Sequence, residues 1–203
     1  MAETTTARGT QAQRRTQAQR REQSRQAVLD SAVRLFGEKG YADTSLEDIA
    51  ADCGLTIRPI YHYFGNKQAL FAAVNEVMEQ RILASMGEGG DFLANWHAYL
   101  ELCDDPHFRQ VVLIDSPNVL GRERWATSPV MNRARAGLGS SEGQDPAARF
   151  RSELVNGVII GAFTEAALMI AEADDLAMAK REAEQLMAHL FARLGDYTAE
   201  SSP

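Results

Sequence analysis

The sequence predicts an all-α protein of about nine helices. Apolar residues recur at intervals of three and four, capping residues and glycines divide the chain at regular intervals, and no alternating run of β-branched residues lasts long enough for a strand. A length of 203 residues suits one large domain or two small ones. Hydrophobic residues make up 45% of the chain and charged residues 24%, a composition that excludes disorder over most of its length.

The first elements expected are a basic arm and one helix. Residues 1–21 consist mainly of Thr, Gln, Ala and Arg, which predicts a disordered arm. From Arg25 the spacing of apolar residues becomes helical, and Gly40 stands where a helix C-terminal cap is expected. The apolar positions of this helix are Val28, Ala32, Leu35 and Phe36.

Two short helices with a glycine between them are predicted next. Thr44 and Glu47 have the spacing of a capping box, which opens a helix reaching Cys53. Gly54 suits a tight turn, and Thr56 can cap a second helix that contains Ile60 and Tyr61. Two short helices joined by such a turn are typical of a helix-turn-helix.

Capping residues mark the remaining helices. Asn66 and each Asp that precedes a proline can accept hydrogen bonds from the free amides of a first helical turn. The predicted helices run from Asn66 to Met86, Asp91 to Cys103, Asp105 to Asp115, Val119 to Trp125, Asp145 to Glu172, and Asp174 or Asp175 to Gly195.

The charge distribution predicts three regions. Residues 1–68 hold ten basic and eight acidic side chains, whereas the remaining 135 residues hold 11 basic and 20 acidic ones, so the total of −7 hides a basic N-terminal part. We expect a basic arm at 1–21, a DNA-binding helix-turn-helix domain at 22–68 and a helical body at 69–203. The acidic body should face away from DNA.

A longer motif strengthens the helix-turn-helix interpretation. Gly54 to Lys67 has the order Gly-Leu-Thr-x-x-x-Ile-Tyr-x-Tyr-Phe-x-Asn-Lys. Together with the segments 36–41 and 44–50, it resembles the TetR family of transcriptional regulators, of the AcrR-like type. This resemblance implies a three-helix head, a ligand-binding body, and a homodimer formed mainly by the last two long helices. The sequence departs from the family pattern at Pro59, where a small residue is usual.

The residues expected to contact DNA fall into three groups. The first turn of the second short helix would present Ile57, Arg58 and Pro59 to base edges, with Arg58 suited to guanine. Hydroxyls, helix N-terminal amides and a lysine can bind phosphates. The expected phosphate contacts are therefore Thr44, Ser45, Thr56, Tyr61, His62, Tyr63 and Lys67. Flexible arginines can enter a minor groove. The arginines expected to do so are Arg14, Arg15, Arg20, Arg21 and Arg25.

Alternatives remain open for several of these residues. Thr44 and Thr56 can act as helix caps alone, and Tyr61 can belong to the core. His62 and the arm arginines can be solvated surface groups without a partner.

The body contains a mixture of apolar and polar residues that suits a small-molecule pocket. The candidates are Trp96, Tyr99, Leu100, Cys103, Phe108, Val112, Asp115, Trp125, Asn156, Ile160 and Thr164. For each of them, packing in the core is the competing interpretation. Small residues beside leucines predict a helix–helix dimer interface, with candidates Leu154, Val158, Gly161, Ala162, Leu176, Ala183, Leu186 and Leu190.

Several function classes are disfavoured by what the sequence lacks. None of the four histidines has a glutamate three residues before it, and no nucleophile elbow, phosphate-binding loop or zinc spacing is present, so no enzyme, metal or cofactor is expected. The apolar run from Leu154 to Ala171 contains Asn156, Thr164 and Glu165, and we expect it to be too short and too polar to cross a membrane. Cys53 and Cys103 are expected to be reduced thiols in a cytoplasmic protein.

These observations predict a ligand-responsive, sequence-specific DNA-binding transcriptional regulator. In its most specific form the hypothesis is a repressor that a small molecule releases from a palindromic operator. The alternative is a helical protein–protein interaction module whose helix-turn-helix no longer binds DNA.

Overall fold

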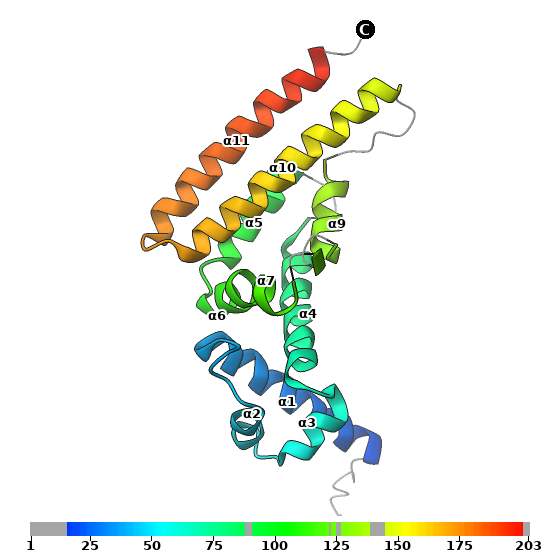
Figure 1. Ribbon diagram of the computed structural model, residues 1–203, viewed down its shortest axis with the longest axis vertical. Coiled ribbons are helices and arrows are strands. Elements are labelled where there is room, and N and C mark those ends of the chain that lie inside the picture. The colour runs from blue at the N-terminus through cyan, green and yellow to red at the C-terminus, as the bar shows by residue number, and fades with distance from the viewer. Residues whose placement is uncertain (1–15, 88–90, 122, 125–126, 139–144, 201–203) are drawn as a thin grey trace, which may run out of the picture.

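The computed structural model describes residues 16–87, 91–121, 123–124, 127–138 and 145–200, with side chains described as far as residue 194. Helices make up nearly all of these segments, and no strand occurs within them. The predicted all-α fold is therefore confirmed. Figure 1 shows a head of three helices at one end and two long antiparallel helices at the other, connected through a group of shorter helices.

The head consists of α1 (Gln17–Lys39), α2 (Leu46–Asp52) and α3 (Ile57–Phe64). Helix α1 begins earlier than expected, because Thr16 and Gln19 form a capping box in which each side chain accepts a hydrogen bond from the other residue's backbone amide. The prediction of a disordered arm through residue 21 is therefore wrong from residue 17 onward.

A long helix, α4 (Lys67–Ser85), connects the head to the body. Asn66 caps it as predicted, since its Oδ1 accepts a hydrogen bond from the amide of Ala69 at 2.8 Å. Leu70, Phe71 and Val74 are fully buried, and the ring of Phe71 packs edge-on against Phe36 of α1 at 5.3 Å between centroids. The start of α4 therefore belongs to the core of the head.

The body begins with α5 (Phe92–Leu102), followed by α6 (Pro106–Phe108), η1 (Arg109–Asp115) and α7 (Ser116–Val119). The sequence predicts one helix over residues 105–115, but only α6 is α-helical and η1 is a π-helix. Residues five apart share a face in a π-helix. Accordingly, Gln110 Nε2 donates a hydrogen bond to Asp115 Oδ2 at 3.1 Å.

The second half of the body consists of α9 (Pro129–Ala136), α10 (Pro146–Glu172) and α11 (Leu176–Glu200). Helix α9 was not predicted, although Ser128 and Pro129 form the same capping pattern that marks other helices of this chain. The expected helix at 119–125 is only partly described: α7 ends at Val119, residues 123 and 124 are helical, and residues 122 and 125 lie outside the described residues. Helix α11 continues past the predicted end at Gly195.

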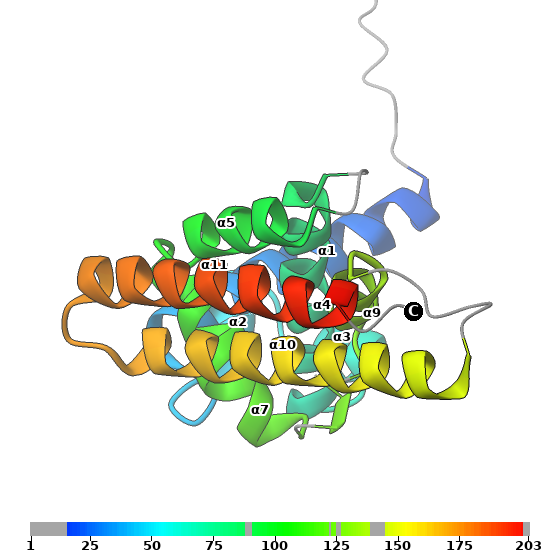
Figure 2. The same ribbon diagram turned by 90° about the horizontal axis from the view of Figure 1, so that it is seen from above.

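Helices α10 and α11 pack side by side over the rest of the body, as Figure 2 shows from above. Beneath them, the ring of Phe163 on α10 is buried against two aromatic residues of α5. Its centroid lies 4.9 Å from the ring centroid of Trp96 and 5.1 Å from that of Tyr99. By length and composition alone α10 could cross a membrane, contrary to the expectation that this run is too short and too polar. Its packing against neighbouring helices is equally typical of a core helix in a soluble protein.

The C-terminal end of α1 is packed closely against the body. A Cβ atom placed on Gly37 would lie 2.5 Å from Cβ of His107, so only a glycine allows this approach. Two residues beyond the helix, the backbone amide of Tyr41 donates a hydrogen bond to Asp115 Oδ2 at 2.8 Å. These contacts connect the head to α6 and η1.

Candidate nucleic-acid interface

Helices α2 and α3 form a helix-turn-helix. Ser45 caps α2, because its hydroxyl accepts the amide of Asp48 at 3.0 Å while Asp48 Oδ2 accepts the amide of Ser45 at 3.1 Å. The Ser45 hydroxyl also donates to Asp48 Oδ2 at 2.7 Å, and this bond, together with the bond from the Ser45 amide, lowers the pKa of Asp48. In the turn, Gly54 has a φ of +69°, and the amide of Leu55 donates to the carbonyl of Ala50 at 2.9 Å.

The predicted capping box of Thr44 and Glu47 is wrong by one residue. Thr44 is only 1% exposed, and its hydroxyl donates to the carbonyls of Gly40 at 2.8 Å and Leu35 at 3.1 Å. Its role is to fix the end of α1, so it cannot reach a phosphate. Ser45, the neighbouring candidate, lies at the N-terminus of α2, where a phosphate is favoured by the free amides.

The first turn of α3 presents the residues that were expected to contact bases. Arg58 is exposed, and within the described chain it has no hydrogen-bond or ion-pair partner. Ile57 and Pro59 are half-buried, whereas Ile60 is fully buried and anchors the helix. Thr56 is exposed, and its hydroxyl makes no capping bond, so it is available to a phosphate.

The later residues of α3 approach the N-terminal part of α1. Tyr61 is 52% exposed, which disfavours its alternative role in the core. His62 Nε2 lies 2.8 Å from Arg21 Nη2, and because a guanidinium only donates, the imidazole nitrogen is the acceptor. Arg20, Arg21, His62 and Tyr63 border one groove of about 360 Å³. The structure thus brings together candidates that lie 41 residues apart.

The other four basic candidates differ in their surroundings. Arg25 lies 5.5 Å over the ring of Phe64 and forms an ion pair with Glu22, so it packs within the head. Lys67 Nζ lies 4.3 Å over the ring of Tyr41 and donates to the carbonyl of Ala42. Arg14 and Arg15 lie outside the described residues.

A polar cluster that sequence inspection missed holds α2 against α1. Asp52 at the end of α2 accepts a hydrogen bond from Ser31 Oγ at 2.6 Å and forms an ion pair with Arg34. Arg34 also pairs with Glu38 at 2.9 Å. No local pattern identifies this cluster, because the partners are 18 and 21 residues from Asp52.

Most ligand-binding candidates of the body are part of its core. Seven are at least 91% buried, namely Trp96, Tyr99, Leu100, Cys103, Phe108, Val112 and Ile160. Burial raises the pKa of the Cys103 thiol to about 12, which keeps it protonated. Within the described chain, the buried Nε1 of Trp96 and hydroxyl of Tyr99 have no hydrogen-bond partner.

The remaining ligand-binding candidates have other positions. Asp115 accepts bonds from Tyr41 and Gln110, so it connects the body to the head. The Thr164 hydroxyl donates to the carbonyl of Ile160 in its own helix, and Asn156 is half-buried on α10. Trp125 lies outside the described residues.

The dimer candidates divide into two groups. Leu154, Val158, Gly161 and Leu186 are exposed on α10 and α11. Ala183 is buried within the protomer, and Ala162, Leu176 and Leu190 pack partly against its core, so these four contribute to the fold of one chain. Sequence inspection missed the exposed apolar side chains of Phe150, Met169 and Met178 on the same two helices.

Comparison with known proteins agrees with this arrangement. Residues 28–74 match the model of bacterial regulatory proteins of the tetR family, and residues 90–194 match the tetracyclin repressor-like C-terminal domain. The regulator AcrR of Shigella flexneri is 42% identical over 59 residues, which cover 29% of this chain and 27% of AcrR. The negative regulator IcaR of Staphylococcus aureus is 34% identical over 47 residues, which cover 23% of this chain and 25% of IcaR.

Solved structures match over a larger part of the chain. A TetR-family transcriptional regulator from Pectobacterium atrosepticum is 30% identical, with a TM-score of 0.62 over 89% of this chain and 97% of the other. A tetR-family regulator from Streptomyces coelicolor has the same TM-score at 21% identity, over 89% of this chain and 84% of the other, and it supports the fold alone. By the two domain matches and the likeness over nearly all of the Pectobacterium protein, this chain belongs to the TetR family.

Proposed function

We propose that this protein is a dimeric, sequence-specific DNA-binding regulator that acts in the cytoplasm and represses transcription until a small molecule binds its body. The observation that carries the proposal is the exposed first turn of α3, which bears Arg58, on a helix whose later residues border a groove together with Arg20 and Arg21. A helix of this kind enters the major groove with its N-terminal residues facing the bases. Repression is inferred from the relatives, since IcaR is a negative regulator and AcnR of Corynebacterium efficiens is a repressor.

A dimer would use the exposed apolar face of α10 and α11. Phe150, Leu154 and Val158 follow one another at intervals of four on α10, and Met178 and Leu186 lie eight apart on α11. Two copies of this face can form a two-fold symmetric four-helix interface. The two heads would then contact half-sites about 34–36 Å apart on one side of the DNA.

The chemistry of the effector is suggested by α5. In the described structure the buried Asn95 Nδ2, Trp96 Nε1 and Tyr99 hydroxyl all lack an acceptor. Burial raises the pKa of Tyr99 well above its ordinary value, so its hydroxyl remains a donor. Since unmatched buried donors are costly, an effector with acceptor oxygens fits this helix.

The experiment that tests DNA binding is a titration of the purified protein with fragments from upstream of its own gene. We expect a shifted complex whose affinity falls steeply with salt, because binding releases counterions from the phosphates. If no fragment binds at any salt concentration, the alternative of a protein–protein interaction module is favoured.

Replacing Arg58 with alanine should reduce discrimination at one base position by about 1–3 kcal/mol, because a bidentate contact to guanine is lost. The measurement is the affinity for the operator and for single-base variants at that position. Arg20→Ala is the matched control, and it should weaken binding to all sequences equally while lowering the salt slope by about 1. An equal loss on every sequence for Arg58→Ala would assign that side chain to a phosphate.

A further inference from the structure

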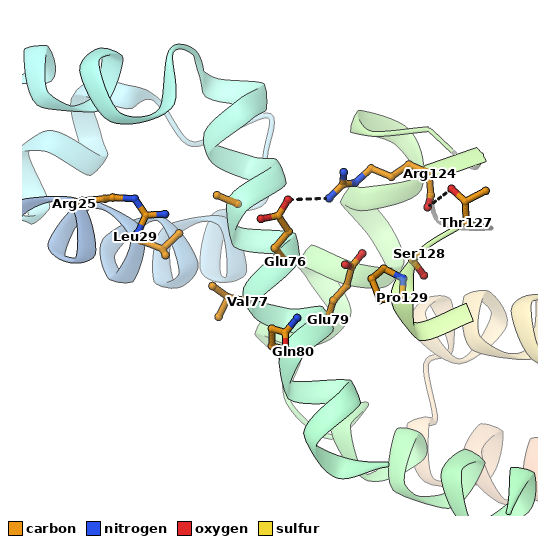
Figure 3. A pocket seen from close by; sticks show the side chains of 11 residues that line it. Arg25, Leu29, Glu76, Val77, Glu79, Gln80, Arg124, Thr127, Ser128 and Pro129 are labelled. Carbon is orange, nitrogen blue, oxygen red and sulfur yellow. Dashed lines mark hydrogen bonds and ion pairs between the residues drawn. The ribbon is translucent and has the colours of Figure 1, made fainter. Parts of the chain in front are cut away.

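A cleft of about 550 Å³ lies where the head meets the body, away from the buried aromatic cluster of α5. Figure 3 shows its walls, which come from α1, α4, residue 124 and residues 127–129 at the start of α9. Leu29, Val77 and Pro129 give the cleft apolar surface, and its charged groups are two acids and two bases, namely Glu76, Glu79, Arg25 and Arg124.

Glu79 is the distinctive group of this cleft, because it is a carboxylate that is 93% buried. Its Oε1 accepts a hydrogen bond from Asn75 Nδ2 at 2.8 Å, and among the described residues Glu79 has no other hydrogen-bond partner and no ion pair. Burial raises the pKa of Glu79 despite the charge of Arg124. A buried carboxylate without a cation in direct contact is destabilising, and a positively charged donor would relieve this cost.

Arg124 lies on the opposite wall and is incompletely paired. Its Nη2 is 3.5 Å from Glu76 Oε1, a long contact between partly exposed groups. Its Nε is buried and, among the described residues, has no acceptor. Figure 3 shows Glu79 extending from α4 toward the segment that carries Arg124. The cleft therefore presents one unmatched acceptor and one unmatched donor around an apolar surface.

We propose that this cleft binds a small organic cation, in which a protonated amine pairs with Glu79 and an apolar skeleton packs on Leu29, Val77 and Pro129. An acceptor atom near the amine would bind Arg124 Nε. Arg25 and Arg124 also line the cleft, but at the position beside Glu79 an anion is disfavoured, because Glu76 and Glu79 lie on the same helix and would repel it. Since α1 belongs to the head, and residues 124 and 127–129 belong to the body, the occupant would contact both parts of the molecule.

The test measures binding by calorimetry on the purified full-length protein without DNA, so that its outcome is independent of the proposed DNA-binding function. The probe is phenethylammonium chloride, with 3-phenylpropanamide and 3-phenylpropionate as neutral and anionic analogues of similar shape. We expect the cation to bind at least about tenfold more tightly than either analogue, a difference that corresponds to loss of one buried charge pair.

Two variants locate the site. Glu79→Gln should weaken binding of the cation by about tenfold or more, whereas Glu172→Gln, at an exposed position on α10, should leave it unchanged. Thr127→Trp should block the cleft from an exposed position and also abolish binding. No binding of the cation to the wild-type protein, equal binding of the anion, or binding to Glu79→Gln within twofold of wild type would each overturn the proposal.

The same variant gives a prediction for the ligand-free protein. When folding raises the pKa of a carboxyl, the free energy of unfolding falls as the pH rises. The fall begins near the pKa in the unfolded chain, about 4.3, and is complete above the pKa in the folded protein. Glutamine does not titrate, and it keeps an acceptor for Asn75. Glu79→Gln should therefore have a higher free energy of unfolding than wild type at pH 7.5, and the difference should shrink toward pH 4. Urea unfolding at both pH values measures this, and a less stable variant at pH 7.5 would contradict it.

Discussion

Replacing Gly37 with alanine should lower the free energy of unfolding by about 1–2 kcal/mol, although alanine favours helices. The added Cβ would lie 2.5 Å from Cβ and 3.1 Å from Cα of His107, and neither atom can move without the backbone of α6. Overpacking of this kind costs about 1–3 kcal/mol, whereas the gain in helix propensity is at most about 1 kcal/mol. Steric repulsion between α1 and α6 should therefore dominate.

A double-mutant cycle with His107→Gly isolates this contact. Removing the Cβ of His107 makes room for the one at position 37, so the double variant should be more stable than the sum of the single effects predicts. Urea unfolding of the four proteins gives the coupling free energy. Additive effects would show that the destabilisation of Gly37→Ala arises somewhere other than at His107.

Replacing Leu186 with arginine should convert the protein to a monomer in the micromolar range. Leu186 is 59% exposed within one chain, and two-fold symmetry would place the new charge at the interface twice. Loss of the dimer should also reduce operator affinity by about 10²-fold or more. In a dimer, binding of the first head raises the effective concentration of the second head at its half-site, and a monomer lacks this effect. Sedimentation and DNA titration measure the two effects.

Ala188→Arg is the matched control on the same helix. Ala188 is also exposed, but it lies on a different side of α11 from Leu186. This variant should remain dimeric and bind DNA as the wild type does. A dimeric Leu186→Arg protein would exclude this face as the interface.

Four helix starts could be predicted from their capping residues, although Thr16 and Ser128, which cap α1 and α9, were not recognised. The side chains of Asn66, Asp91, Asp105 and Asp145 each accept a hydrogen bond from a backbone amide in the first turn of the helix that follows. Local sequence does not show whether Thr44 or Ser45 caps α2, because each is followed three residues later by an acidic residue. Burial of the Thr44 hydroxyl under the end of α1 decides it. The π-helical register of η1 likewise depends on packing rather than on composition.

The candidate site was predictable to the extent that it is local. The exposed first turn of α3 follows from a motif of fourteen consecutive residues. By contrast, the environments of Asp52 and Glu79 depend on partners that are distant in the chain. The body candidates could not be separated into core and pocket, because Trp96 and Tyr99 have the same apolar character in either role. Only their burial and unmatched donors distinguish them.

The position of α1 has a mechanical consequence. Its last residues contact His107 and lie beside Asp115, while Arg21 near its first residues contacts His62 of α3. With 23 residues at 1.5 Å each, the helix is about 34 Å long. A tilt of about 5° about its body end would therefore displace the other end by roughly 3 Å. An angular change too small to disturb the core would be enough to move a guanidinium out of hydrogen-bonding range of a phosphate.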